Sequence, residues 1–304
     1  MFEGLGQVKM PTIQKSRNRF FIYLMIPGCI FLLIAIVAPM ISTFSMSLEN
    51  YNFTKPKART WIGFKNYIDI FTDPLFWLSV KHTLIYVVYA VGLQFLLGMV
   101  FAQLFFRMAK ENSVAMSFFI LPSVISPVVV GLVFRYMLNT EFGFFTYLFD
   151  RLGLFRNVAL LGNASTSLGT IIAADIWQWT PFITLMMVAG MTALPNEPFE
   201  AAKVDGASGF SSFIHITLPL LKPVIRVSLM LRIADVVKEF DKIFVMTEGG
   251  PGVSSETMNY LSYRVNFRYF QMGKGSALVI IILVFIVLLS ILTFKAIKTK
   301  EEIY

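Results

Sequence analysis

Two long stretches of this 304-residue chain, Phe20–Leu48 and Ser276–Phe294, contain no charged residue. A helix needs about 20 apolar residues to cross the hydrocarbon core of a bilayer. In a helix at the surface of a soluble core, polar residues would recur with the helical period of about 3.6 residues and form a polar face. Neither stretch has such a face, so both predict membrane-spanning helices. With 56% hydrophobic and only 14% charged residues, the chain is predicted to be an all-α integral membrane protein.

The distribution of apolar residues predicts six spans. They cover residues 20–44, 83–106, 113–137, 168–194 and 223–246, with a last stretch that ends near residue 294. The expected organisation is an N-terminal tail at 1–19, a six-span domain at 20–294 and a C-terminal tail at 295–304. Six spans put both ends on one side, and the basic tails and the Arg107–Lys110 turn favour the cytoplasmic side. The first outside loop departs from this rule, because it contains Lys55, Lys57, Arg59 and Lys65.

Several functions are disfavoured by what the chain contains. The net charge of +8 comes mostly from Lys and Arg in tails and loops, which indicates topology signals and lipid contacts rather than nucleic-acid binding. The chain has one cysteine, Cys29, so an intrachain disulfide is excluded. Cys29 lies in an apolar stretch, which argues against a metal cluster. Neither a nucleophile motif nor a phosphate-binding Gly-x-x-x-x-Gly-Lys-Ser/Thr loop occurs. We therefore expect no enzyme activity and no cofactor in this chain.

A polar, charged segment at 195–222 separates the fourth and fifth spans. Asn196 can cap a short helix whose acidic first turn, with Glu200, suits the positive end of the helix dipole. Gly206 tolerates the left-handed conformation of a helix C-cap, and Ser208 can cap a second short helix that Pro219 ends or bends. The segment therefore predicts a compact helix–turn–helix. An ordinary amphipathic surface hairpin would carry much the same caps.

The spacing within this segment is more specific than its caps. Glu200-Ala201-Ala202 is followed after three residues by Gly206, and after nine more by Ile216-Thr217-Leu218-Pro219. This pattern resembles the EAA loop of the permease subunits of ATP-binding-cassette importers, which docks in a cleft of the ATPase subunit. The resemblance implies a six-helix type I importer permease fold, with a cytoplasmic coupling helix, in a prokaryotic cell membrane. It assigns ATPase docking to Glu200, Ala201, Ala202, Asp205, Gly206, Ile216, Leu218 and Pro219.

Three shorter elements resemble the carbohydrate-uptake branch of these importers, of the maltose-transporter type. They are Gly63-Phe64-Lys65-Asn66-Tyr67, Trp177-Gln178-Trp179-Thr180-Pro181-Phe182 and Thr247-Glu248-Gly249-Gly250-Pro251. The resemblance implies a sugar, oligosaccharide or polyol as solute, a second homologous permease, an extracytoplasmic solute-binding protein and two ATPase subunits that bind ATP and Mg. Another polar solute, such as a glycerophosphodiester or an amino-acid derivative, stays open. An ATP-independent secondary carrier would usually show symmetry between its halves and pairs of broken helices, and the sequence indicates neither.

The fifth predicted span is unusually charged, with Arg226, Arg232, Asp235, Lys238, Glu239, Asp241 and Lys242. In a continuous helix Arg232, Asp235, Glu239 and Lys242 would share one stripe, and charges inside a membrane demand partners or water. Counting from the motifs of the resembling family places Asp175, Trp179, Phe182, Arg232 and Glu239 on the substrate pathway, and the stripe adds Asp235. In the alternative interpretation, these ions only pair with one another and staple subunits together.

Overall fold

The structure, a computed structural model, describes residues 12–108, 113–155 and 158–297. The predicted tails at 1–19 and 295–304 and the Arg107–Lys110 turn therefore lie partly outside the described residues. The α-helices are α1 (Thr12–Ser47), α2 (Lys65–Phe71), α3 (Pro74–Met108), α4 (Ser113–Val124), α5 (Pro127–Met137), α6 (Phe144–Arg151), α7 (Ser167–Thr192), α8 (Glu197–Val204), α9 (Gly209–Ser212), α10 (Leu218–Leu220), α11 (Lys222–Val237), α12 (Asp241–Met246), α13 (Met258–Tyr263) and α14 (Met272–Ala296). A 3-10 turn (Pro56–Ala58) lies between the short antiparallel strands β1 (Glu49–Asn50) and β2 (Thr60–Trp61), and π-helical turns occupy Phe213–Thr217 and Arg264–Arg268.

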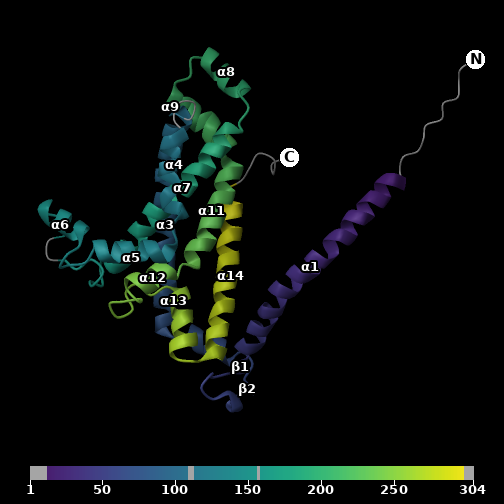
Figure 1. The fold of residues 1–304 in the computed structure, drawn as a ribbon, viewed down its shortest axis with the longest axis vertical. Helices are drawn as coiled ribbons and strands as arrows, with labels where there is room; N and C mark the ends of the chain where they lie inside the picture. The colour runs from purple at the N-terminus through teal and green to yellow at the C-terminus, as the bar shows by residue number, and fades with distance from the viewer. Residues whose placement is uncertain (1–11, 109–112, 156–157, 298–304) are drawn as a thin grey trace, which may run out of the picture.

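The long helices α3, α7, α11 and α14 form the body of the molecule (Figure 1). Helix α3 packs against α7 and α11, and α11 packs against α14. The short helices α8 and α9 lie at one end of this bundle, and the β1–β2 hairpin lies at the opposite end (Figure 1). Helices α5 and α6 project to one side. This arrangement separates the segment with the EAA spacing from the hairpin by the length of the bundle.

Among the described residues, four helices are long and apolar enough to cross a membrane. They are Tyr23–Ser47 of α1, Pro74–Phe106 of α3, Ser167–Thr192 (α7) and Met272–Ala296 (α14). Two further pairs of helical segments meet the same criteria when the two members of a pair are counted as one span, although each pair is bent. They are Val114–Val124 with Pro127–Met137, and Gly209–Leu220 with Lys222–Met246. Six spans result if each bent pair is counted once. Each overlaps one of the six predicted stretches, but the second begins at Pro74 rather than at residue 83 and the fifth at Gly209 rather than at residue 223.

The third predicted span is not one continuous helix, because α4 and α5 meet at a bend of 90°. Ser126 precedes Pro127 and has an extended ψ of 136°, and a residue before proline is disfavoured in the helical region. The break leaves the carbonyl of Ile125 without a helical partner, and Gln178 of α7 donates its side-chain N–H to that oxygen at 2.8 Å. A neighbouring helix thus satisfies the group that the bend exposes.

The fifth predicted span is also broken, between α11 and α12. The Oε1 atom of Glu239 accepts a hydrogen bond from the backbone N–H of Lys242 at 3.0 Å and so caps the first turn of α12. The carbonyl of Lys238 accepts a hydrogen bond from the side chain of Asn259. The expectation of a continuous helix through residues 223–246 is therefore wrong, and side chains take over the backbone bonds at the break.

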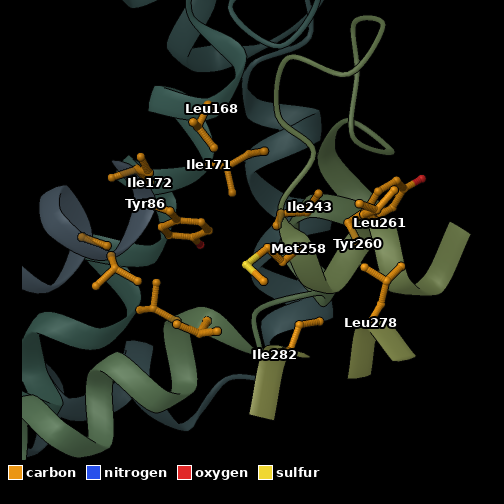
Figure 2. Packing of buried hydrophobic residues seen from close by; sticks show 14 of the residues in the cluster. Tyr86, Leu168, Ile171, Ile172, Ile243, Met258, Tyr260, Leu261, Leu278 and Ile282 are labelled. Carbon is orange, nitrogen blue, oxygen red and sulfur yellow. The ribbon is translucent and has the colours of Figure 1, made fainter. Parts of the chain in front are cut away.

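The main hydrophobic core lies where α3, α7, α12, α13 and α14 converge (Figure 2). Tyr86, Ile171, Ile243, Met258 and Leu278 come from these five helices and are almost completely buried. A second cluster, nearer α8, contains Met99, Met187 and Leu221. From Tyr23 onward, helix α1 contributes no side chain to either core: its apolar side chains from Tyr23 to Ile41 are exposed, and it leaves the bundle at an angle (Figure 1). Such a surface is stable only against lipid or another subunit.

Candidate substrate pathway and coupling surface

Asp175 lies at the centre of a buried charge network. It is fully buried in the middle of α7, with its Oδ2 atom 3.1 Å from Nη2 of Arg232 and its Oδ1 atom 3.0 Å from Nζ of Lys242. Gln94 donates from Nε2 to Asp175 Oδ2 at 2.8 Å and accepts from Arg232 Nε at 3.1 Å. One carboxylate therefore links α3, α7, α11 and α12.

Lys242 is the second buried cation of this network. Its Nζ lies 2.7 Å from Oε2 of Glu239 and donates to Oε1 of Gln178 at 3.1 Å. Two carboxylates and two cations thus neutralise one another inside the protein. Removing such charges from water costs several kcal/mol per ion, and the cost is repaid only when the charges are well paired and their remaining hydrogen-bonding groups are satisfied. The first physical effect of this network is therefore to fix the relative positions of the four helices.

An aromatic surface adjoins the network. The guanidinium carbon of Arg232 lies 4.7 Å from the ring centroid of Trp179, a cation–π contact, and Phe182 meets Trp179 edge-on with 5.9 Å between ring centroids. Both rings are only partly buried. The structure therefore brings together Asp175, Trp179, Phe182 and Arg232.

Asp235 and Lys238 form the accessible edge of the network. Their side chains are 49% and 57% exposed, and the Nζ of Lys238 lies 3.3 Å from Oδ1 of Asp235. The Oδ2 atom of Asp235 lies 3.7 Å from Nη1 of Arg232. An exposed ion pair of this kind contributes little to stability, so its donors and acceptors can exchange partners with a solute.

The predicted stripe of Arg232, Asp235, Glu239 and Lys242 is wrong. Helix α11 ends at Val237, so Glu239 and Lys242 lie beyond it, and the buried partner of Arg232 is Asp175 rather than Asp235. Sequence reasoning also missed Gln94 and Gln178. Each is an amide in the interior of an apolar predicted span, which is a usable signal, because an amide in that setting must find a partner.

The EAA helix is built largely as the sequence predicts. Helix α8 carries Glu200 and Ala201 on its exposed surface, Gly206 adopts a left-handed φ of +74°, and Ser208 caps α9 by accepting from the backbone N–H of Ser211. The side chain of Asn196 makes no cap hydrogen bond, so that predicted contact is wrong. Helix α8 therefore lies at the end of the bundle with Glu200 and Ala201 of the EAA motif exposed.

The two halves of the motif differ in burial. The first half is mostly exposed: Ala202 is partly buried, and the exposed residues are Glu200, Ala201, Asp205 and Gly206. The second half is partly buried throughout, at Ile216, Leu218 and Pro219. Leu218 packs against the second hydrophobic cluster. The first half thus offers a surface to a partner, and the second half anchors that surface to the bundle.

Comparison with solved structures identifies the fold. A chain of the bacterial alginate ABC transporter, solved in complex with an alginate pentasaccharide-bound periplasmic protein, superposes with a TM-score of 0.79. The match covers 96% of this chain and 99% of that one, at 20% sequence identity. The type I importer permease fold expected from the sequence is confirmed.

Sequence comparison identifies the family. A probable ABC transporter permease, y4oQ of Sinorhizobium fredii, is 33% identical over 286 residues, covering 94% of this chain and 92% of that protein. The trehalose/maltose transport system permease MalF of Thermococcus litoralis is 34% identical over 292 residues, covering 95% and 97%. Residues 94–297 match the family described as binding-protein-dependent transport system inner membrane component, and the chain belongs to that family. It is a membrane component of a transport system and not an enzyme.

The network predicts a sharp contrast between two aspartates. Asp175→Asn leaves two buried cations with one carboxylate and should destabilise the protein by about 3–5 kcal/mol. Asp235→Asn changes an exposed pair and should cost about 1 kcal/mol or less. Thermal unfolding and assembly of the detergent-solubilised protein measure both. Equal stability of the two variants would contradict a structural role for the buried network.

Proposed function

We propose that this chain is one permease subunit of an ATP-driven importer and forms half of the pathway for a sugar, oligosaccharide or polyol. The observation that carries this proposal is one bundle with an exposed EAA helix at its end and, farther along, partly exposed aromatic rings beside an exposed ion pair. The Thermococcus relative, named for trehalose and maltose, supports a carbohydrate solute.

The pathway surface suits a polyhydroxylated solute. The faces of Trp179 and Phe182 can stack on the C–H faces of a sugar ring, and the exposed Asp235 and Lys238 can accept from and donate to its hydroxyls. We assign Asp175, Arg232 and Glu239 to the pathway as positioning residues: Arg232 contacts both the Trp179 ring and the Asp235 carboxylate, and is itself held by Asp175.

Another polar solute is the alternative. A relative from Agrobacterium fabrum, 29% identical over 283 residues, is a sulfoquinovosyl glycerol transport system permease, so solutes with a charged group occur among the relatives. The ion pairs of this site contain three carboxylates (Asp175, Asp235, Glu239) and three cations (Arg232, Lys238, Lys242). This balance leaves no surplus positive charge for an anion, and it favours an uncharged sugar over a glycerophosphodiester.

The importer requires partners. We assign this chain a second homologous permease, two ATPase subunits that bind ATP and Mg, and an extracytoplasmic solute-binding protein. The exposed α8 helix, with Glu200, Ala201 and Asp205, inserts into an ATPase cleft, and Gly206 provides the turn. The chain itself holds no cofactor in this scheme.

Movement of α8 reaches the pathway through two helices. Helix α7 leads into the coupling segment and α11 leaves it. The helices lie close together near that end, because a Cβ atom on Gly190 of α7 would lie 3.1 Å from Val224 of α11. The Asp175–Arg232 pair joins the same two helices farther along. ATPase closure would therefore shift them as a unit, in a two-state rocking motion.

The coupling assignment predicts the effect of reversing one charge. Glu200→Lys should leave the permease folded and inserted, because Glu200 is exposed, but should lower ATPase co-purification and reduce solute uptake by roughly tenfold or more. Glu197→Lys, on the same exposed helix but outside the EAA motif, is the matched control and should retain uptake. Normal co-purification and uptake in Glu200→Lys would refute the docking assignment.

We also propose that both chain ends and α8 face the cytoplasm. Helix α1 begins, and α14 ends, toward the end of the molecule that carries α8 (Figure 1). In contrast, the β1–β2 hairpin lies at the other end and would face outward.

Cysteine labelling tests this orientation. In a Cys29→Ser background, single cysteines replacing exposed Lys203 on α8 and exposed Ala58 in the hairpin loop should react with a membrane-impermeant reagent from opposite sides. Lys203→Cys should label only from the cytoplasmic side. Labelling of both positions from the same side would rule out the six-span topology.

A further inference from the structure

The segment between α1 and α3 carries cations at the end of the molecule opposite α8 (Figure 1). Lys55, Lys57, Arg59 and Lys65 all lie in or beside the β1–β2 hairpin. With both chain ends in the cytoplasm, these cations are on the outer side, where the bias of Lys and Arg toward cytoplasmic loops does not account for them. They call for another physical explanation.

The hairpin segment is fixed directly to the end of the first span. Ser47 is the last residue of α1, and its carbonyl accepts a hydrogen bond from the buried side-chain amide of Asn66 at 2.8 Å. The same amide donates to the carbonyl of Glu49 at 2.9 Å, and the hydroxyls of Ser47 and Tyr67 lie 2.7 Å apart. The start of α2 is therefore held against the point where α1 leaves the hydrocarbon. This places the segment at the depth of the lipid headgroups.

Among the residues that the structure describes, one of the four cations has a carboxylate partner. Arg59 pairs with Glu49, donating from Nη2 to Oε1 at 3.0 Å, and lies over the ring of Tyr51. Within the described ranges, Lys55, Lys57 and Lys65 have no carboxylate within 4 Å, and all three are exposed. Three ammonium groups are thus available to bind anions.

Aromatic side chains stand among these lysines. Phe53, Trp61 and Phe64 are 58%, 65% and 65% exposed. Ile68 and Phe71, also exposed, continue from Phe64 at helical spacing along α2. Exposed aromatic rings interleaved with lysines at the end of an apolar span are typical of the bilayer interface, where rings sit at headgroup level and ammonium groups contact phosphates.

We propose that this hairpin surface, defined by Phe53, Lys55, Lys57, Trp61, Phe64 and Lys65, binds anionic phospholipid headgroups of the outer leaflet. The three lysines contact the phosphates, and the three rings enter the interface beside them. The surface thereby anchors the outer end of α1, a helix that has no place in either hydrophobic core of this chain. A competing interpretation is that the lysines dock an acidic face of the solute-binding protein.

The test uses the assembled importer in lipid nanodiscs of phosphatidylcholine, with or without phosphatidylglycerol. We expect the wild type to melt at a higher temperature when phosphatidylglycerol is present. The triple substitution Lys55→Gln, Lys57→Gln and Lys65→Gln should remove about half or more of that difference. The matched triple Lys→Arg substitution keeps the charge and should retain the difference. Native mass spectrometry should show fewer retained phosphatidylglycerol molecules on the Gln variant alone.

Three outcomes would overturn the proposal. The wild type could show no phosphatidylglycerol-dependent shift, or the Gln variant could retain the full shift and the same number of bound lipids. In the third, the Gln variant would lose stimulation of ATP hydrolysis by the solute-binding protein in phosphatidylcholine alone while keeping its lipid-dependent shift. That result would assign the lysines to protein docking instead.

Discussion

Asp175 must neutralise two cations at once inside a bundle that lies in a membrane. Neither Arg232 nor Lys242 is exposed, and their nitrogen atoms lie 3.1 and 3.0 Å from the oxygens of this carboxylate. In a medium of low dielectric constant, losing either partner would leave an uncompensated charge. The positions of α3, α7, α11 and α12 are therefore coupled, because all four contribute side chains to the same contact.

The break in the fifth span follows from this requirement. Glu239 neutralises Lys242 and at the same time caps the backbone of α12, which it does from a position outside α11. A continuous helix would keep Glu239 on the stripe of Asp235, at the accessible edge. The break instead divides the charges into a buried group that fixes the helices and an exposed pair, Asp235 and Lys238, that remains open to a solute.

The same helices connect the two ends of the proposed mechanism. Helices α7 and α11 flank the coupling segment, contact each other where Gly190 meets Val224, and are joined again at Asp175 and Arg232. A displacement at α8 is then carried by packed, paired elements rather than by flexible loops. This is the kind of element that can switch between two discrete arrangements.

Local signals in the sequence predicted much of this structure. Apolar stretches predicted the spans, and Gly206 and Ser208 predicted the turn and second helix of the coupling segment because their effects depend on adjacent backbone. Neither the bend at Ser126 nor the break after Val237 was predicted. Pro127 is a local signal for the bend, but proline also lies inside an unbroken helix of this chain, Pro181 in α7, and the carbonyl groups freed at the two breaks are satisfied by side chains from elsewhere, those of Gln178 and Asn259. The partner of Arg232 could not be predicted either, because Asp175 lies 57 residues away in sequence.

The division between buried and exposed charges is tested most directly by measuring uptake and assembly in two variants of the importer. One combines Asp235→Asn with Lys238→Gln, and the other carries Arg232→Met. The first should assemble at wild-type levels and lose roughly tenfold or more in uptake, whereas the second should fail to assemble normally because Asp175 loses a buried partner. Full uptake in the first variant, or normal assembly of the second, would contradict the account.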